Sequence, residues 1–322
     1  MEFFRGVNVD WLRLKWYFLA FSMIFSVAGV ISMASHWAQI GSPVPLGVDF
    51  KGGTQVQAQF QQVPDINKIR SAMDAAGLKD ARIQRYDELS NNEVLISLPE
   101  QTDETHLDAD RQQIVSTLQA HYDNPVMLPL RNVQVVGPTV GKQLEKQALL
   151  ATLYSMLGML VYLWFRFQLI YGVAAVVACF HDTLITVGAF ALLNKEISLT
   201  VIAAILTLVG YSMNDTIVVF DRIRENLRMS RRESLPDVVN RSINQTLSRT
   251  VLTSGLTFLT VLSLYIFGGE VLKGFSFALV VGILIGTYSS IAVAAPMLVA
   301  WQEWRAKQGN AAVLPAAKRA RM

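Results

Sequence analysis

Six separate runs of mostly apolar residues are the feature of this sequence that most limits its fold. Each run is close to the roughly 20 residues that an α-helix needs to cross the hydrocarbon core of a bilayer. The chain of 322 residues is 52% hydrophobic and only 16% charged, whereas a soluble domain has about 25% charged residues. The predicted transmembrane helices cover residues 16–34, 148–165, 170–193, 197–220, 250–267 and 275–301. The sequence therefore predicts a multi-pass membrane protein built on an all-α bundle of six transmembrane helices.

Lysine and arginine residues gather in alternate connecting segments, and this sets the expected orientation. The two turns at one end of the predicted bundle contain only Lys195 and Lys273. The opposite end carries the basic segments, which are residues 1–15, 221–249 and 302–322. Because cytoplasmic loops carry an excess of these residues, we expect both termini in the cytoplasm and the segment 35–147 in the periplasm.

The first apolar run has a second interpretation, as a cleaved signal peptide. Ser32, Met33 and Ala34 resemble a cleavage site, and basic residues precede the run. The run is longer than the apolar region of about 7–15 residues that signal peptides contain. We therefore expect a retained transmembrane helix.

Several classes of function lack the residues that they need. The single cysteine, Cys179, allows no intrachain disulfide and no cysteine-based metal site. The sequence has no Walker A pattern and no Gly-x-Gly-x-x-Gly motif at the start of a helix, so nucleotide binding has no support. We expect no metal, no cofactor, no nucleic-acid partner and no enzymatic activity. Any transport therefore needs an energy source other than a bound nucleotide.

The segment 35–147 has the patterns of a compact α/β domain. Between Gln55 and Gln61, apolar residues alternate with glutamine, which predicts a half-buried strand. The elements expected to follow are a helix over 64–77, strands over 81–86 and 93–98, a helix over 107–118, and strands over 125–130 and 133–136. With the strand over 125–130 added as a further strand, the order fits a ferredoxin-like β-α-β-β-α-β domain.

Residues 236–249, between the fourth and fifth predicted helices, have the pattern of an amphipathic helix. Val239, Ile243 and Leu247 lie on one side, and arginine and asparagine residues lie opposite. We interpret this segment as an anchor that lies in the cytoplasmic interface of the membrane.

Four ionisable residues occur inside or at the edge of the predicted transmembrane helices. His181 and Asp182 lie near the middle of the third helix, Asp215 in the inner half of the fourth, and Arg249 at the start of the fifth. Such residues are unfavourable in a bilayer and usually face the bundle interior or water. Asp215 and Arg249 have similar depths, so they form either an ion-carrying pair or a static bridge between two helices. His181 and Asp182 either join the ion pathway or make a buried hydrogen bond.

Polar residues at helical spacing accompany both members of the Asp215–Arg249 pair. On the fourth helix, Thr207, Tyr211 and Ser212 share a face with Asp215, and Asn214 precedes it. The residues that follow Arg249 at the same spacing on the fifth helix are Thr253, Thr257 and Thr260. The predicted ion pathway consists of His181, Asp182, Thr207, Tyr211, Ser212, Asn214, Thr253 and Thr257.

Small residues recur every four positions on the sixth helix. They are Ala278, Gly282, Gly286, Ser290 and Ala294. Such a ridge lets two helix backbones approach closely. We expect it to pack against a helix of this chain or of a partner.

Two motifs in this chain resemble those of the SecD/SecF family, which belongs to the RND superfamily. Residues 46–54 read LGVDFKGGT, similar to the Gly-Gly signature of that family, and residues 210–225 read GYSMNDTIVVFDRIRE, similar to the fourth-helix motif of its SecF members. The His181–Asp182 pair and the Ser248-Arg249-Thr250 sequence also match in position. The resemblance extends over essentially the whole chain, including its length and expected topology.

The resemblance implies an accessory subunit of the Sec translocase in the bacterial inner membrane. Members of the family work with SecD, which supplies another six helices, beside the SecYEG channel and often with YajC. They are thought to use the proton-motive force to move unfolded polypeptide outward, and some members use sodium. Asp215 and Arg249 match the ion-coupling pair of the family, and H⁺ is the expected coupling ion. The alternatives are a scaffold that stabilises the translocon without transporting ions, and an RND-type exporter of small molecules or lipids.

The Gly-Gly signature joins the first helix to the external domain. Glycine permits backbone dihedrals that are closed to other residues. The signature residues Gly47, Asp49, Phe50, Gly52 and Gly53 therefore form either a hinge or a tightly packed rigid joint.

Overall fold

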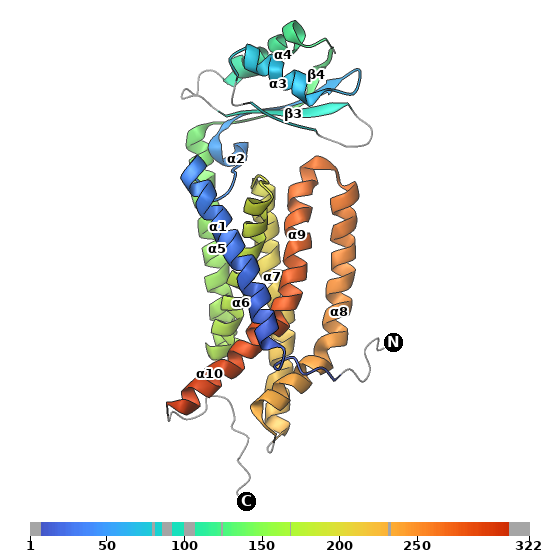
Figure 1. Cartoon of the computed structure of the whole chain (residues 1–322). Helices are drawn as coiled ribbons and strands as arrows, with labels where there is room; N and C mark the ends of the chain where they lie inside the picture. The colour runs from blue at the N-terminus through green and yellow to red at the C-terminus, as the bar shows by residue number, and fades with distance from the viewer. Residues whose placement is uncertain are drawn as a thin grey trace, which may run out of the picture.

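The computed structural model describes residues 8–78, 81–85, 92–99, 107–123, 125–167, 169–230 and 233–308. Two parts are visible in Figure 1: a bundle of long helices, and a small domain with a β-sheet and two helices at one end of it. We call these parts the bundle and the sheet domain. The end of the bundle next to the sheet domain is its domain end, and the other is its far end.

Six described helical segments are long and apolar enough to cross a membrane. The helices of the bundle are α1 (Lys15–Ile40), α5 (Pro138–Arg166), α6 (Leu169–Leu192), α7 (Leu199–Met229), α8 (Leu235–Phe267), α9 (Gly269–Ser289) and α10 (Ala295–Lys307). A π-helical turn, Ser290–Ala294, joins α9 to α10, so that these two elements form the sixth span. The predicted six-helix architecture is confirmed. Several helices extend well past the apolar runs, most clearly α8, which begins 15 residues earlier, and α5, which begins 10 residues earlier.

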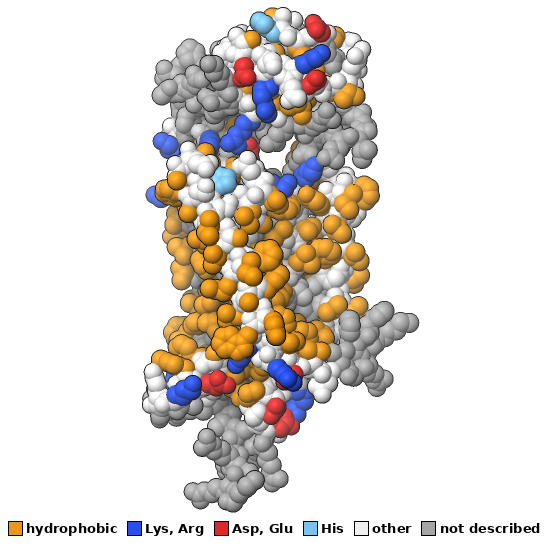
Figure 2. All heavy atoms as spheres, viewed as in Figure 1, with side chains coloured by type: hydrophobic (Ala, Val, Ile, Leu, Met, Phe, Trp, Pro, Cys, Tyr) orange, Lys and Arg blue, Asp and Glu red, His pale blue; other side chains and the backbone are white. Residues whose placement is uncertain are grey.

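The outer surface of the bundle is apolar. Figure 2 shows hydrophobic side chains over the length of the helices, and charged side chains beyond the two ends. Large apolar side chains that a soluble protein would bury are exposed here, including Tyr17, Ile24 and Phe165. This distribution suits a surface that faces lipid, because the lipid chains replace the protein core as the apolar environment.

Small residues allow close helix contacts within the bundle. A Cβ atom on Gly29 of α1 would lie 3.0 Å from the Cα atom of Gly188 on α6. On α9, a Cβ atom on Gly282 would lie 2.5 Å from the Leu208 side chain, and one on Gly286 would lie 3.1 Å from Cβ of Ser212. The structure therefore places the small-residue ridge of the last span against α7 of the same chain.

The sheet domain has ferredoxin-like topology. Its elements are β1 (Gly53–Phe60), α3 (Ile66–Ala75), β2 (Arg82–Arg85), β3 (Glu93–Pro99), α4 (Leu107–His121) and β4 (Val126–Val136). All neighbouring strands are antiparallel, in the order β2-β3-β1-β4. Val56 and Phe60 of β1 are buried with Met73 of α3 and Leu118 of α4. Figure 1 shows both helices on the face of the sheet that points away from the bundle.

One detail of the predicted sheet is wrong. The segment over 125–130 does not form a strand of its own, because β4 runs continuously from Val126 to Val136. The register of β4 against β1 shifts between Gln57 and Gln59. This irregularity accommodates the extra residues of β4 in a single long strand.

The interpretation of residues 236–249 as an interfacial anchor is also wrong. This segment is the first part of α8, and Val239, Ile243 and Leu247 are buried in the main core of the bundle. The polar side is occupied as well, since the side chain of Asn240 accepts a hydrogen bond from the backbone N–H of Leu12 (3.1 Å). The apolar side therefore packs against protein, although the same pattern of residues would suit a helix that packs against lipid.

Candidate functional site

Asp215 is a buried carboxylate in the middle of α7. Its side chain is 3% exposed. Its Oδ2 atom accepts a hydrogen bond from the Oγ–H of Ser254 on α8, at 2.6 Å. Ser254 is not among the predicted site residues, because nothing local to the sequence distinguishes it from the other hydroxyl residues of α8.

Arg249 lies near Asp215 without contacting it. The Arg249 side chain is on the exposed side of α8, and its charge still acts on Asp215. Among the described residues, no nitrogen of Arg249 lies within 4.0 Å of an Asp215 oxygen, the limit for an ion pair. The structure therefore shows Asp215 held by an uncharged hydroxyl, with the guanidinium at longer range, and no static bridge in this conformation.

Asp182 is the centre of a second buried polar cluster. It is 0% exposed. Its Oδ2 atom accepts hydrogen bonds from Ser212 of α7 (2.5 Å) and Ser289 of α9 (3.0 Å), and Oδ1 lies 3.0 Å from Nδ1 of His181. Ser289 directly precedes the π-helical turn, a distortion that is frequent at functional sites. The predicted grouping of Ser212 with Asp215 is therefore replaced by a contact between Ser212 and Asp182.

Several buried polar atoms of α6, α7 and α8 lack a hydrogen-bond partner. Among the described residues, they include Nε2 of His181, the hydroxyl of Tyr211 and Oγ1 of Thr250. A buried polar group without a partner costs about 1–3 kcal/mol. Each of these atoms can therefore take a water molecule or an ion as its partner.

The remaining hydroxyls of the predicted pathway bind their own helix. Thr207 donates to the carbonyl of Ala203 (2.8 Å), Thr253 to that of Arg249 (3.0 Å), and Thr257 to that of Thr253 (2.9 Å). Thr207, Asn214 and Thr253 are exposed. These residues lie on a surface of α7 and α8 that no described part of this chain covers.

The Gly-Gly signature packs tightly at the domain end. Phe50 is 3% exposed, and a Cβ atom on Gly141 of α5 would lie only 2.5 Å from the Phe50 carbonyl oxygen. Gly52 and Gly53 have φ angles of 77° and 127°, which other residues rarely adopt. Burial and the nearby positive charge of Arg82 lower the pKa of Lys51, against the opposing effect of Glu196. The packing favours a joint over a freely moving hinge.

Comparison with protein families identifies two matching regions. The family described as "Protein export membrane protein SecD/SecF, C-terminal" matches residues 116–304, and the "SecD/SecF GG Motif" matches residues 37–62. The second match contains the signature, and the first contains both buried carboxylates.

Relatives match along almost the whole chain. The protein translocase subunit SecF of Koribacter versatilis is 56% identical, and the match covers 97% of this chain and 96% of the relative. SecF of Vibrio alginolyticus is 40% identical, with 90% and 89% covered.

The fold also matches a solved structure. The crystal structure of SecDF from Thermus thermophilus, described as a translocon-associated membrane protein, has a TM-score of 0.78 and 35% identity to this chain. The match covers 92% of this chain but 39% of that longer one. Since the family match spans more than half of the chain and the relatives match over nearly their full length, this chain belongs to the SecF family of protein translocase subunits.

Proposed function

We propose that this Sec translocase subunit, together with SecD, uses the proton-motive force to promote export of unfolded polypeptides across the bacterial inner membrane. One observation carries the proposal. Asp215 is buried within a membrane-spanning helix, its direct partner is the neutral hydroxyl of Ser254, and the Arg249 charge is nearby but not bound. A carboxylate in these surroundings can exist with or without its proton, as a proton carrier must.

The mechanism follows from the two states of Asp215. When the carboxylate is ionised it attracts the Arg249 guanidinium, because opposite charges interact strongly away from water. Protonation removes that attraction and leaves the hydrogen bond with Ser254. Alternation between these states shifts α8 relative to α7, since Arg249 and Ser254 are on α8 and Asp215 is on α7. Proton entry from the periplasm and release into the cytoplasm then drive a repeated change in helix packing.

A SecD partner completes the membrane part in this proposal. Thr207, Asn214, Arg249 and Thr253 are exposed on helices that cross the membrane, and polar groups are unfavourable against lipid. A second set of helices would cover them. The longer SecDF chain has room for such a set, because this chain matches 39% of it. SecYEG, YajC and the exported polypeptide are the further proposed partners.

The proposed orientation has both termini in the cytoplasm and the sheet domain in the periplasm. It is supported by the basic residues of the far end, among them Arg222, Arg224 and Arg228 on α7. In this orientation the sheet domain lies where a polypeptide leaves the channel.

The test measures proton flux and export in vesicles that contain the complex with SecD and SecYEG. Asp215→Asn keeps the shape of the side chain but cannot release a proton, so both activities should fall by about 100-fold, within the range of a lost proton-transfer group. Asp221→Asn, the same change at an exposed position six residues further along α7, is the matched control and should change neither. Assembly of each variant is checked by co-purification. Full export by an assembled Asp215→Asn complex would favour the scaffold function instead.

A further inference from the structure

The loop between α6 and α7 is bonded to the segment that leads into the Gly-Gly signature. The N–H of Ile197 donates to the carbonyl of Pro45, and the N–H of Gly47 donates to the carbonyl of Ile197, both at 2.9 Å. Leu46 and Ile197 thus form a short parallel bridge. A Cβ atom on Gly47 would lie 3.3 Å from the Ile197 carbonyl oxygen. The two segments are therefore held edge to edge at the domain end.

Asp49 extends this contact to the first residue of α7. Its Oδ2 atom accepts a hydrogen bond from the backbone N–H of Leu199 at 2.8 Å. The first N–H groups of a helix have no partner within the helix and carry partial positive charge, which a carboxylate stabilises. Ser198 caps the same end through the N–H of Val201. The start of α7 is thus capped twice, once by its own residue and once by the signature.

The residues around Asp49 are attached both to the sheet domain and to the bundle. Asp49 lies on α2 (Val48–Lys51), and β1 begins two residues after α2 ends. Phe50 is buried in one cluster with Phe190, Ile197 and Val201. A second link runs from the sheet itself, since Arg82 of β2 forms an ion pair with Glu196 of the α6–α7 loop. Figure 1 shows α2 between the sheet and the domain end of the helices.

The same helix carries Asp215. Position 215 follows position 199 by 16 residues, which is about 24 Å along an α-helix. We propose that Asp49 is a positioning residue that transmits the movement of α7 to the sheet domain through its contact with Leu199. This inference rests on the proposed function, and it assigns the route of coupling to α7 in addition to the covalent connection through α1.

The test separates proton flux from export in the complex with SecD and SecYEG. Asp49→Ala removes the acceptor but leaves Asp215 and Ser254 in place, so flux should stay within about twofold. Export per proton should fall about fivefold, the factor expected for loss of a helix cap of about 1 kcal/mol. Asp49→Asn keeps an oxygen that can accept the Leu199 N–H, and it should recover at least half of the lost export.

The matched control is Asp65→Ala. Asp65 also caps a helix, α3, by accepting from the N–H of Asn67 at 2.9 Å, but that helix lies within the sheet domain. The Asp65→Ala variant should therefore lose a comparable helix cap but keep the wild-type export per proton. Unchanged export in Asp49→Ala, or equal losses of flux and export, would overturn the inference. A wild-type flux that does not depend on Asp215 would instead overturn the proposed function.

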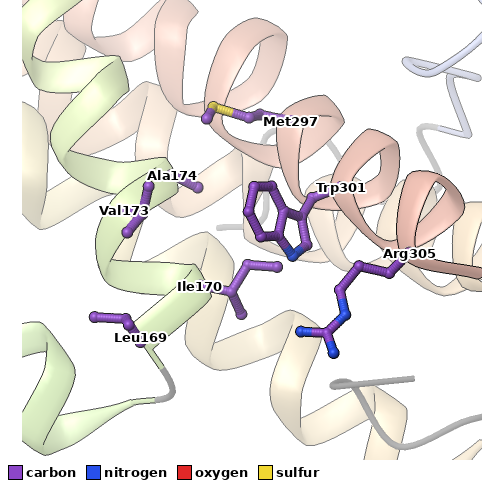
Figure 3. Close-up of a pocket in the computed structure, with 7 residues that line it drawn as sticks. All are labelled: Leu169, Ile170, Val173, Ala174, Met297, Trp301 and Arg305. Atoms are coloured by element: carbon purple, nitrogen blue, oxygen red, sulfur yellow. The ribbon is translucent and has the colours of Figure 1, made fainter. Parts of the chain in front are cut away.

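A groove at the far end supports a second, independent inference. Its cavity volume is about 220 Å³, and it lies between the start of α6 and α10. In Figure 3, Trp301 and Arg305 extend from α10 toward Leu169 and Ile170 of α6. The other lining residues, Val173, Ala174 and Met297, are apolar.

Arg305 supplies the charge that this groove presents. Its Nε atom is buried, and its guanidinium has neither a hydrogen bond nor an ion pair with any residue that the structure describes. Guanidinium groups bind phosphate with paired hydrogen bonds, and tryptophan is typical of the headgroup level of a membrane. We infer that the groove binds one anionic phospholipid, with its phosphate on Arg305 and an acyl chain along the apolar wall of α6.

The test is lipid binding by the purified complex with SecD, measured by native mass spectrometry. Phosphatidylglycerol should bind at least about fivefold more tightly than phosphatidylcholine of the same chain length, because the choline cation of phosphatidylcholine offsets the negative charge of its phosphate beside Arg305. Arg305→Gln should remove this preference, and Lys307→Gln, an exposed cation one half-turn further along α10, should keep it. Equal binding of the two lipids, or a preference unchanged in Arg305→Gln, would overturn the inference.

Discussion

Asp215 and Asp182 are both buried carboxylates in membrane-spanning helices, and the structure surrounds them differently. Asp215 has a single hydroxyl partner, Ser254, and an arginine nearby. Asp182 is 0% exposed and has polar partners from three helices. The partner helix of Asp215, α8, is largely exposed through its apolar length, whereas α6 and α9 are among the more buried helices.

This difference suggests different roles for the two carboxylates. A group with several fixed partners in a packed core resists a change of charge, because every partner has to rearrange. A group with one partner, beside a helix whose apolar length is largely exposed, can change its charge with less rearrangement. We therefore interpret Asp182 as the group that joins α6, α7 and α9, and Asp215 as the group that exchanges protons.

The largest expected effect is on proton flux, when the same substitution is made at Asp215 and at Asp182. Asp215→Asn should lower proton flux by about 100-fold, whereas Asp182→Asn should lower it by no more than about threefold, because only the first removes a proton-transfer group. Flux into vesicles containing the complex with SecD gives the ratio. Equal losses in the two variants would show that Asp182 also carries protons and would remove the distinction.

Substitution of Asp182 should lower the stability of the protein more than substitution of Asp215, the reverse of their expected effects on proton flux. Asp182→Ala leaves the hydroxyls of Ser212 and Ser289 without their acceptor, so it should lower the free energy of unfolding by about 2–3 kcal/mol. Asp215→Ala leaves only Ser254 without its acceptor and should cost about 1 kcal/mol. Thermal unfolding of the purified complex in detergent measures both changes. Asp182→Asn, which keeps one acceptor oxygen, should recover part of the loss, and a larger loss at Asp215 than at Asp182 would contradict the assignment.

The serine partners of the two carboxylates should also differ in their effects on flux and on stability. Ser254→Ala removes the direct partner of Asp215 and should lower flux about fivefold, the equivalent of one hydrogen bond of about 1 kcal/mol. Ser289→Ala removes one of several partners of Asp182 and should lower stability by a similar free energy, with flux unchanged within about twofold. Measuring flux and thermal unfolding on both variants tests the pair. A flux defect confined to Ser289→Ala would reverse the roles of the two sites.

The architecture was predictable from the sequence because its signals are local. Apolar runs of membrane-spanning length define the helices, and the alternation around Val56 and Phe60 defines the first strand. The length of β4 was not predictable, since it depends on an irregular register with β1 that involves residues far apart in the chain. The burial of the first part of α8 was missed for a related reason: an apolar stripe does not show whether protein or lipid covers it.

The partners of the buried carboxylates were only partly predictable. Ser212 and Asp215 are three residues apart, so their directions on an α-helix differ by about 60°. That angle is enough for Ser212 to reach Asp182 on α6 while Asp215 reaches Ser254 on α8. Ser254 and Ser289 could not be assigned from the sequence, because their roles depend on how α8 and α9 are rotated against α7.

The smallest expected effect concerns the threonines that the sequence placed in the ion pathway. Thr207→Val and Thr253→Val keep nearly the same side-chain shape but remove hydroxyls that bind carbonyls of their own helix. Such bonds add little to helix stability and do not involve Asp215. Each variant should therefore keep proton flux within about twofold of wild type, less than the change of about fivefold expected for Ser254→Ala. Thr257→Val is the third member of the set, since its hydroxyl donates to the carbonyl of Thr253. If all three variants retain flux while Ser254→Ala loses it, proton access to Asp215 depends on the buried side of α8. A loss of tenfold or more in any threonine variant would place the pathway on the exposed side, against the proposed SecD partner.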